Sequence, residues 1–439
     1  MTYRGQRVAV WGAARSGIAV SNLLVHLGAI VHLSDTQSVS ALKLDDLHPN
    51  VRVTGGGNVI GDAHTVVPSP GIPPRHRLFD DARSQGVRIA SEIEVAASIA
   101  NAPMIAITGT DGKTTTTEMA ARAVEGAGRR PIVAGNIGTP LSARVLEATP
   151  DDVLVVEVSA FQLWSTGYFA PHAGVITNIA GDHADYFDHD LHAYAAAKLR
   201  LLRDMSPGSS AILKGDDPAL AHVQRPPGVS KVTFQAAPTD DGWGYAGGWL
   251  THAGRPIMAA SELKVAGVHN ICNAQAALAA GLALGLAPDG LVAGLQSFEG
   301  LPHRVERVRC RRGVWWVNDS KATNPHAAAA GLSAQMGPVI IITGGFDKGL
   351  DLAPLIDAFD TVKHVIAMGT TAPRMVAACG ARWPHSVARD MADAVRLADG
   401  ISETGDTIIL SPAASSFDAY RSYAHRGEVF KKIVTELPE

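Results

Sequence analysis

Short runs of apolar, mostly β-branched residues alternate along most of the chain with longer runs rich in alanine and leucine. A short apolar run that ends in a polar or glycine-containing loop is typical of a buried strand, and the longer runs are typical of helices. Repetition of this pair of elements indicates parallel α/β units. The pattern therefore predicts an α/β protein.

The alternation falls into three series, which predict three domains. A Rossmann-like domain is expected over residues 1–92, a central P-loop-type α/β domain over 93–300, and a second Rossmann-like domain over 301–439. The strands expected in these series are 8–11, 30–33, 65–67, 104–107, 131–133, 153–156, 174–177, 314–317, 339–342, 364–367 and 407–410.

The pattern changes between residues 231 and 257, where short apolar runs are separated by glycine-rich turns. This stretch predicts a β-hairpin insertion or a small antiparallel sheet inside the central domain. The alanine-rich run from His269 to about Gly285 predicts a helix.

Composition narrows the class of protein. Hydrophobic residues make up 46% of the 439 residues and charged residues 18%, which indicates a globular chain with sizeable cores. The net charge of −4 argues against a nucleic-acid-binding protein. Three scattered cysteines and no apolar stretch approaching a membrane span predict a cytoplasmic enzyme without a membrane segment.

The sharpest local signal is the segment IAITGTDGKTTT at residues 105–116, where an apolar strand leads into glycines, a lysine and threonines. Such a loop turns backbone N–H groups toward phosphate oxygens, Lys113 adds a positive charge, and the Thr114 hydroxyl suits Mg²⁺. It is not a strict Walker A loop, because Ile107 stands where the first glycine is required. The alternative is an ordinary strand–turn–helix with a solvated lysine.

A second glycine turn, GAARSG at residues 12–17, follows the first strand, and Asp35 ends the next strand. The pattern is a weak dinucleotide fingerprint, since Ala14 occupies the second glycine position. It predicts a nucleotide phosphate at the helix start with Asp35 near a ribose or base; the alternative is a tight turn without ligand.

Polar side chains follow two further strands of the central series. Glu157 follows the run VLVV and suits a Mg²⁺ ligand, and His183 lies between Asp182 and Asp185 in a later loop. Lys198 is expected in a helix, and its spacing predicts only an ordinary helix lysine.

These features together resemble the Mur ligases, which join amino acids to a UDP-muramoyl precursor, and most of all the D-glutamate-adding members. The matching motifs run along nearly the whole chain: TGTDGKTTTT at 108–117, GNIG at 135–138, EVSAFQL at 157–163, TNIAGDH at 177–183, AAKLR at 196–200, HNICNAQAA at 269–277, GLPHRVE at 300–306, NDSKATNP at 318–325, GGFDKG at 344–349 and LSPAASSFD at 410–418. Asp111 departs from a frequent Asn in the phosphate loop.

The resemblance implies ATP-dependent addition of D-glutamate to UDP-N-acetylmuramoyl-L-alanine through an acyl phosphate. It implies that ATP is bound by Gly109, Thr110, Asp111, Gly112, Lys113, Thr114, Thr115, Asn270, Asn273, Arg304 and Asp319. It implies that Thr114 binds Mg²⁺ with the phosphates, that Glu157 holds a first Mg²⁺, and that His183 and a carbamylated Lys198 hold a second. It also implies that Lys321 lies close to the reacting groups. Lys113, Glu157, His183, Lys198 and Lys321 are then the catalytic residues.

The same resemblance implies three further subsites. The uridine diphosphate would contact Ser16, Asp35, Thr36 and Gly71; the muramoyl peptide would contact Asn136, Ser159 and Gln162; and D-glutamate would contact Thr323, Lys348, Ser416, Phe417 and Tyr423. Partners are expected to be small molecules, with no nucleic acid or membrane, and the protein is expected to be a monomer.

Three rival functions stay open. A folylpolyglutamate synthase-like ligase shares the chemistry, but a Rossmann-like domain before the phosphate loop argues against it. An NAD-dependent oxidoreductase would use residues 12–17 and leave Gly112-Lys113 without a role. A nucleotide-binding regulatory module without catalysis is the third.

Overall fold

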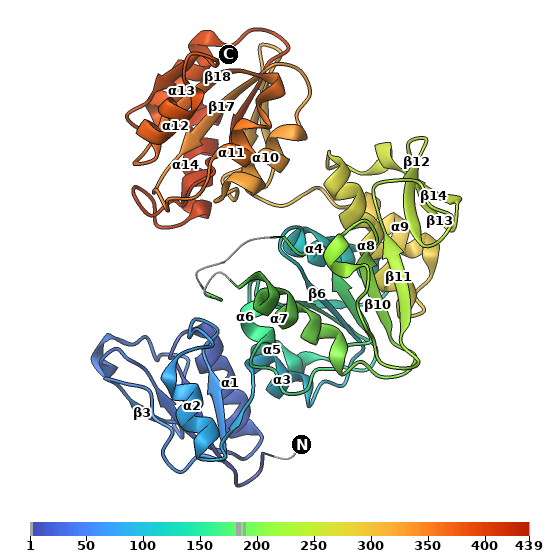
Figure 1. Ribbon diagram of the computed structural model, residues 1–439, viewed down its shortest axis with the longest axis vertical. Coiled ribbons are helices and arrows are strands. Elements are labelled where there is room, and N and C mark those ends of the chain that lie inside the picture. Colours follow the sequence, from blue (N-terminus) through green and yellow to red (C-terminus); the bar gives the residue numbers. More distant parts are fainter. Residues whose placement is uncertain (1–2, 181–185, 188–189, 439) are drawn as a thin grey trace. The chain divides into compact units, whose positions relative to one another are not determined.

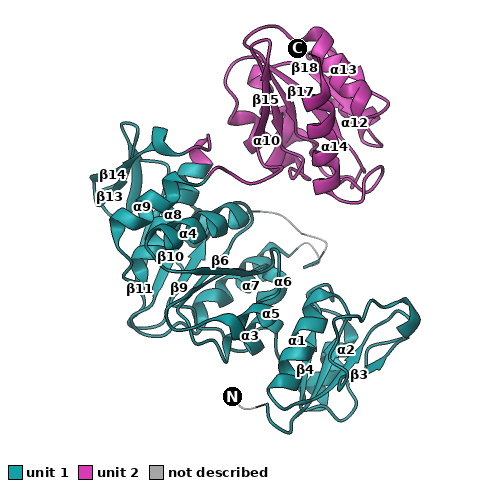
Figure 2. Cartoon of the chain, turned by 180° about the vertical axis from the view of Figure 1, so that it is seen from behind, with its two compact units in different colours: residues 1–263, 270–298 teal, residues 264–269, 299–439 magenta. Residues whose placement is uncertain are grey.

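The computed structural model of the protein describes residues 3–180, 186–187 and 190–438. The chain divides into two compact units, one of residues 1–263 and 270–298 and the other of residues 264–269 and 299–439 (Figures 1 and 2). The first unit contains a five-stranded and a nine-stranded sheet, and the second contains a six-stranded sheet. No helix of the described residues is long and apolar enough to cross a membrane.

The first sheet is parallel and has the strand order β3-β2-β1-β4-β5. Its strands and helices are β1 Arg7–Trp11, α1 Arg15–His26, β2 Ile30–Ser34, β3 Arg52–Thr54, β4 Thr65–Pro68, α2 Arg77–Ser84 and β5 Arg88–Ile89. In this order the chain reverses direction across the sheet between β1 and β4, as in Rossmann folds. The loop after β1 therefore lies at the edge of the sheet where such folds bind nucleotides.

The nine-stranded sheet has the order β14-β13-β12-β11-β10-β9-β6-β8-β7. Its strands are β6 Met104–Thr108, β7 Pro131–Gly135, β8 Val153–Glu157, β9 Ala173–Ile176, β10 Ser210–Lys214, β11 Ser230–Phe234, β12 Trp243–Ala246, β13 Trp249–His252 and β14 Arg255–Ala259. Strands β6 to β11 run parallel, and β12 to β14 are antiparallel to one another.

The antiparallel strands do not form a separate sheet, which corrects one of the two alternatives predicted for residues 231–257. β11 belongs to the parallel part, and β12 joins its end through the pair Phe234–Trp243. The insertion therefore lengthens the central sheet at one edge, beside β11 (Figure 1).

The helices of the central region are α3 Glu92–Ala97, α4 Lys113–Gly126, α5 Leu141–Arg144, α6 Ala160–Leu163, α7 Leu191–Arg203, α8 Val268–Ala283 and α9 Pro288–Gln296. α4 packs closely on α9, because a Cβ atom at Gly294 would lie only 2.0 Å from the carbonyl oxygen of Arg122. This contact holds the helix that follows the phosphate loop. Short 3-10 turns of the chain lie at Val39–Ala41, Val145–Glu147, Pro218–Leu220, Ala260–Glu262 and Phe359–Thr361.

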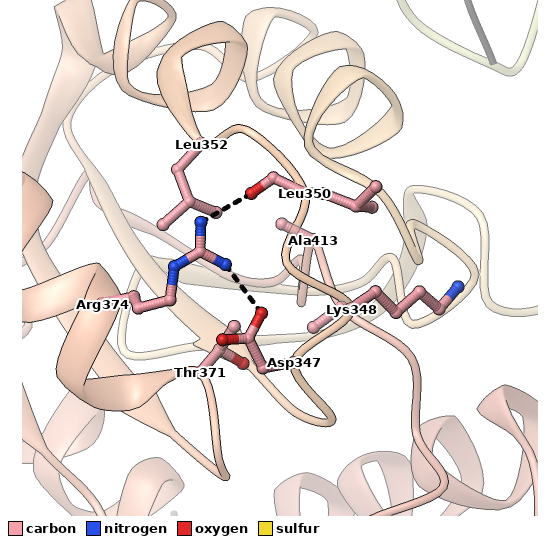
Figure 3. A pocket seen from close by; sticks show the side chains of 8 residues that line it. Asp347, Lys348, Leu350, Leu352, Thr371, Arg374 and Ala413 are labelled. Atoms are coloured by element: carbon pink, nitrogen blue, oxygen red, sulfur yellow. Dashed lines mark hydrogen bonds and ion pairs between the residues drawn. The ribbon is translucent and has the colours of Figure 1, made fainter. Parts of the chain in front are cut away.

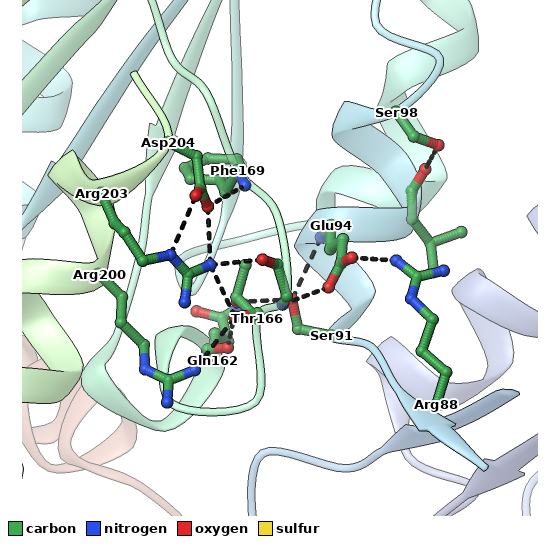
Figure 4. A network of polar contacts seen from close by, with 12 residues as sticks. Arg88, Ser91, Glu94, Ser98, Gln162, Thr166, Phe169, Arg200, Arg203 and Asp204 are labelled. Carbon is green, nitrogen blue, oxygen red and sulfur yellow. Dashed lines mark hydrogen bonds and ion pairs between the residues drawn. The ribbon is translucent and has the colours of Figure 1, made fainter. Parts of the chain in front are cut away.

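A polar network joins β5 and α3 to the loop after α6 and to α7 (Figure 4). The buried Glu94 carboxylate pairs with Arg88 and accepts a hydrogen bond from the Gly167 N–H at 2.6 Å. Arg203 donates to the Gly167 carbonyl and to Asp204. Through Glu94, this network connects β5 of the first sheet with the loop after α6, and Arg203 on α7 contacts the same loop.

The six-stranded sheet has the order β15-β16-β20-β17-β18-β19, and all its pairs are parallel except β15 with β16. Its strands and helices are β15 Glu306–Arg311, β16 Val314–Asn318, α10 Pro325–Ser333, β17 Val339–Gly344, α11 Ala353–Ile356, β18 Val362–Met368, α12 Ala372–Cys379, β19 His385–Val387, α13 Met391–Ile401, β20 Thr407–Leu410 and α14 Tyr423–Glu436.

Helices cover both faces of this third sheet (Figure 1). Ile341 on β17 belongs to one hydrophobic core, and its neighbours Ile340 and Ile342 belong to the core on the other face. Alternate residues of a strand point to opposite faces, so a continuous apolar run is what a strand buried on both faces requires. The predicted α/β fold with Rossmann-like first and third domains is confirmed.

Candidate active site

The phosphate loop runs from the end of β6 to the start of α4, in the predicted strand–loop–helix order. It is closely packed: a Cβ atom would lie 1.8 Å from Thr177 Oγ1 at Gly109, and 2.5 Å from Asn273 Oδ1 at Gly112. Gly112 is the N-cap of α4 with a left-handed φ of 80°. Only glycine meets both demands without strain. The N–H groups at the start of α4 can therefore approach an anion closely.

The Lys113 side chain lies along this loop. Its Nζ donates hydrogen bonds to the carbonyl oxygens of Gly109 at 2.9 Å and Thr110 at 2.7 Å. An ammonium group held over a glycine loop at a helix start matches the phosphate-binding arrangement predicted from sequence. The alternative of a lysine extended into solvent is disfavoured, and phosphate binding itself stays a prediction.

Asn270 and Asn273 are buried on α8, and Asn273 contacts the phosphate loop. Its Oδ1 accepts from the Thr116 hydroxyl at 3.1 Å, and its Nδ2 donates to Asn270 Oδ1 at 3.2 Å. These two residues, predicted as ATP contacts, thus support the first turn of α4 in this structure.

Glu157 lies at the end of β8, which pairs with β6 through Ile107. Its Oε1 accepts from Asn136 Nδ2 at 2.7 Å, whereas its Oε2 is buried without a hydrogen-bond partner among the described residues. A buried carboxylate oxygen without a partner is costly unless a proton or cation satisfies it. The structure thus brings Glu157 and Asn136 together and leaves one carboxylate oxygen suited to a hard cation.

Lys198 on α7 is not the ordinary helix lysine that its spacing predicts, because its side chain is only 1% exposed. Its Nζ donates to the Gly109 carbonyl at 2.6 Å and lies 4.3 Å from the centre of the Tyr194 ring. The Tyr194 hydroxyl is 3.2 Å from Thr110 Oγ1. Burial against neighbouring elements cannot be read from spacing along one helix, so the sequence pattern missed it.

His183, the remaining predicted metal ligand, lies outside the described residues. Within the described ranges, no group of three or more His, Cys, Asp or Glu side chains is arranged to hold a metal ion. The predicted ligand set of Thr114, Glu157, His183 and Lys198 therefore stays a prediction.

Ser159 and Gln162 form a capping box at the start of α6. The Ser159 hydroxyl accepts from the Gln162 N–H at 3.3 Å, and Gln162 Oε1 accepts from the Ser159 N–H at 3.0 Å. The pattern Ser-x-x-Gln signals this motif in the sequence. Their predicted contact with the muramoyl peptide stays open, and helix capping is their role in this structure.

The glycine turn after β1 also has the predicted strand–turn–helix form. Asp35, at the end of β2, accepts from the Ala13 N–H at 2.7 Å and from the Gln37 N–H at 2.9 Å. The Gly71 N–H donates to Ser69 Oγ in the loop after β4. The structure thus brings the turn and Asp35 together beside the strand-order reversal. Within the part of the chain that the structure describes, neither Ser16 nor Thr36 makes a side-chain hydrogen bond that would assign its role.

In the second unit, Arg304, Asp319 and Lys321 lie on two loops joined by hydrogen bonds. Asp319 Oδ1 accepts from the Val305 N–H at 3.2 Å, and the Lys321 N–H donates to the His303 carbonyl at 2.9 Å. Asp319 Oδ2 accepts from the Ser411 hydroxyl at 2.9 Å. Burial raises the pKa of the Asp319 carboxyl from 3.8 to about 7.

This raised pKa predicts that stability falls as pH rises from about 4 to about 7, because the folded state holds a proton that the unfolded state releases. The difference approaches about 4 kcal/mol above that window, at 1.36 kcal/mol per pH unit. Asp319→Asn stays neutral and keeps an acceptor for the Val305 N–H. We expect its free energy of unfolding, relative to that of the wild type, to be higher at pH 8 than at pH 5. Urea unfolding at both pH values measures this, and an equal difference at the two pH values would contradict it.

The loop carrying Lys348 surrounds a small pocket lined by Asp347, Lys348, Leu350, Leu352, Thr371, Arg374, Ala413 and Ala414 (Figure 3). Arg374 donates to Asp347 Oδ1 at 2.7 Å and to the Leu350 carbonyl at 2.9 Å. Lys348 extends away from this ion pair (Figure 3). The Arg374 contacts therefore fix the loop and leave the Lys348 ammonium directed elsewhere.

The other residues predicted for D-glutamate differ in exposure. Ser416 is buried, whereas Phe417 is 73% exposed and Tyr423 is partly exposed at the start of α14. Thr323 lies just before α10. Lys321 Nζ is 5.8 Å from the centre of the Tyr423 ring, so these two predicted site residues lie near each other.

Arg426 is a residue that sequence reasoning missed. Its buried guanidinium donates to the carbonyl oxygens of Ser320 at 2.8 Å, Ala414 at 3.1 Å and Ser415 at 3.2 Å, and to the Ser320 hydroxyl at 3.0 Å. Burial lowers the pKa of this group to about 10. One side chain thereby ties the loop of Asp319 and Lys321 to the loop of Ser416. An arginine in a polar helix pattern carries no signal of this role.

Comparison with known proteins places this fold and site in one family. Residues 107–281 match the Mur ligase middle domain, and residues 303–414 match the Mur ligase glutamate ligase domain. The chain belongs to the Mur ligase family.

The particular relatives are UDP-N-acetylmuramoylalanine–D-glutamate ligases. The protein of that name from Salinibacter ruber is 37% identical over 456 residues, covering 99% of this chain and 98% of the relative. The one from Shouchella clausii is 36% identical over 440 residues, covering 99% and 97% of the two chains.

Solved structures with this fold are more distant. UDP-N-acetylmuramate-alanine ligase from Thermotoga maritima has a TM-score of 0.62 at 16% identity and covers 98% of this chain and 99% of its own. MurF ligase from Thermotoga maritima, solved in complex with ADP, has a TM-score of 0.60 at 16% identity, with 99% and 96% covered. At this identity the likeness shows the fold.

Proposed function

We propose that this protein is an ATP-dependent ligase that joins D-glutamate to UDP-N-acetylmuramoyl-L-alanine in the synthesis of peptidoglycan precursors. The observation that carries the proposal is the similarity, along nearly the whole of both chains, to relatives named for that reaction. The glycine loop with Lys113 and the buried Glu157 beside it support nucleotide chemistry at this site. An NAD-dependent oxidoreductase that uses residues 12–17 would give no role to the glycine loop or to Glu157. A turn without ligand at residues 12–17 gives them no role either.

The proposed reaction has two steps. A carboxylate oxygen of the alanine attacks the γ-phosphorus of ATP, the bond to the β-phosphate oxygen breaks, and an acyl phosphate and ADP result. The neutral amine of D-glutamate then attacks the acyl carbon, inorganic phosphate leaves with the former carboxylate oxygen, and the nitrogen releases one proton. Activation is required because a carboxylate is a poor acceptor for an amine. Lys113 and Arg304 would offset the charge of the phosphoryl group in the first step.

The residues present fit Mg²⁺, because Glu157 offers a buried carboxylate oxygen without a hydrogen-bond partner and Thr114 offers a hydroxyl at the start of α4. We assign a first ion to Glu157, with the Thr114 hydroxyl at the phosphates, and a second ion to His183 and a carbamylated Lys198. A carbamate on the lysine nitrogen carries two oxygens, and oxygen is the ligand atom that a hard cation prefers. When bound, Mg²⁺ neutralises phosphate charge.

The remaining assignments follow the matching positions. We assign residues 1–92 to UDP binding, 93–300 to ATP binding and 301–439 to amino-acid binding. Lys321 would act close to the reacting groups, and Lys348 and Ser416 would bind D-glutamate. We further propose a cytoplasmic monomer whose partners are these small molecules.

The proposal is tested by mixing the protein with ATP, Mg²⁺, UDP-N-acetylmuramoyl-L-alanine and D-glutamate, and measuring phosphate and ADP. We expect equal amounts of both, and none when any one component is omitted. Replacing D-glutamate by L-glutamate should leave only background release. Phosphate release without the UDP substrate, or supported by a folate and L-glutamate, would favour a rival function instead.

A further inference from the structure

The segment after β9, residues 177–180, lies along the phosphate loop and pairs with its backbone. The Thr177 N–H donates to the Thr108 carbonyl at 2.9 Å, and the Thr110 N–H donates to the Asn178 carbonyl at 3.0 Å. The Ala180 N–H donates to Thr110 Oγ1 at 3.0 Å. The first half of the loop is therefore held by a neighbouring strand end as well as by its own chain.

The Asn178 side chain extends this pairing to Asp111, the residue before the Gly112-Lys113 pair. Asn178 Oδ1 accepts from the Asp111 N–H at 2.9 Å, and Asn178 Nδ2 donates to the Asp111 carbonyl at 3.1 Å. One amide side chain thus satisfies both backbone groups of one residue, as a neighbouring strand would. The Thr177 hydroxyl donates to the same Asp111 carbonyl at 2.5 Å.

Asn178 is itself anchored to the sheet. β9 pairs with β6 on one side and with β10 on the other. The next residue, Ile179, donates its N–H to Asp217 Oδ2 at 2.8 Å, and Asp217 Oδ1 accepts from the Ala219 N–H at 2.9 Å. The exposed tip of the phosphate loop is therefore hydrogen-bonded to a segment that is itself held by the sheet.

We propose that Asn178 is a positioning residue for the nucleotide site, which sets the backbone of Asp111 so that the N–H groups of Gly112 and the start of α4 are aimed at the phosphates before ATP binds. The inference rests on the proposed function, since it requires that this loop binds ATP. A loop already held in its binding conformation loses less conformational freedom on binding, which strengthens affinity. Without the amide, the Asp111 N–H loses its partner, the Asp111 carbonyl keeps only the Thr177 hydroxyl, and the loop tip gains alternative conformations.

Asn178→Ala in the full-length protein tests this role, with Asn22→Ala as the matched control. Asn22 makes the same kind of bridge elsewhere, since its Nδ2 donates to the Asp46 carbonyl at 2.8 Å and its Oδ1 accepts from the His48 N–H at 2.8 Å. We expect Asn178→Ala to raise the Kd and KM for ATP roughly tenfold, as two lost hydrogen bonds and a looser loop predict. KM for D-glutamate should not change. Asn22→Ala should lower the melting temperature similarly and leave the Kd for ATP unchanged.

Thr177→Val provides a second variant of equal shape that lacks the hydroxyl donor to Asp111, and it carries the test if Asn178→Ala does not fold. It too should weaken ATP binding while leaving KM for D-glutamate unchanged. If the wild type binds ATP and both variants bind it equally well, Asn178 does not position the loop and the inference is overturned alone. If the wild type binds no ATP, the proposed function falls and this inference falls with it.

Discussion

Lys198→Ala is expected to reduce ligase turnover by more than about 10²-fold while the protein stays folded, because it removes a proposed metal-supporting group at the phosphate loop. Lys198 is buried and contacts the Gly109 carbonyl, so its loss acts directly at that loop. Steady-state rates with ATP, UDP-N-acetylmuramoyl-L-alanine and D-glutamate measure the effect, and circular dichroism checks the fold.

Chemical rescue distinguishes a carbamate from an ordinary buried ammonium at this position. Acetate or formate can enter the space vacated in Lys198→Ala and supply carboxylate oxygens, so partial recovery of rate is expected. Lys198→Met fills the same space without oxygens, and it should be equally inactive but not rescued. A Lys198→Ala protein with wild-type rate in the absence of added acid would rule out the carbamate.

Lys113→Ala is expected to lower kcat/KM by on the order of 10²-fold or more, since it removes a charge that offsets the phosphoryl group in the transition state. Its melting temperature should stay near that of the wild type, because Lys113 is only partly buried. Acetate and formate should not rescue this variant, because a cation is missing. The exposed Lys231→Ala is the matched control and should keep the wild-type rate. A Lys113→Ala protein with a near-normal rate would remove the phosphate loop from the mechanism.

Most strands buried on both faces were predicted from the sequence, although the buried strand β10 was missed. The run Val339–Ile342 has no polar residue, and it forms a central strand between two hydrophobic cores. β15 was missed because Arg307, Arg309 and Arg311 interrupt its apolar positions, as an antiparallel edge strand allows. β3 and β19 were missed because strands of three residues carry too little pattern.

The candidate site also contains features that the sequence predicted and contacts that it did not. The phosphate loop could be predicted because its strand, glycines, lysine and helix are contiguous, and local chemistry alone explains them. Lys198, Arg426 and Asn178 owe their positions to contacts with residues distant in the chain, at Gly109, Ser320 and Asp111. Periodicity within one helix or strand predicts which face is buried, but it does not predict which polar group a side chain on that face contacts. These contacts could therefore be found only from the structure.

The central claim, that ATP activates the substrate carboxylate as an acyl phosphate, is tested most directly by isotope transfer. UDP-N-acetylmuramoyl-L-alanine labelled with ¹⁸O in both oxygens of its alanine carboxylate is converted in the presence of ATP and D-glutamate, and the inorganic phosphate is examined by mass spectrometry. The account predicts one ¹⁸O in each phosphate released and one retained in the new amide. Phosphate free of ¹⁸O, or label recovered in AMP, would contradict it.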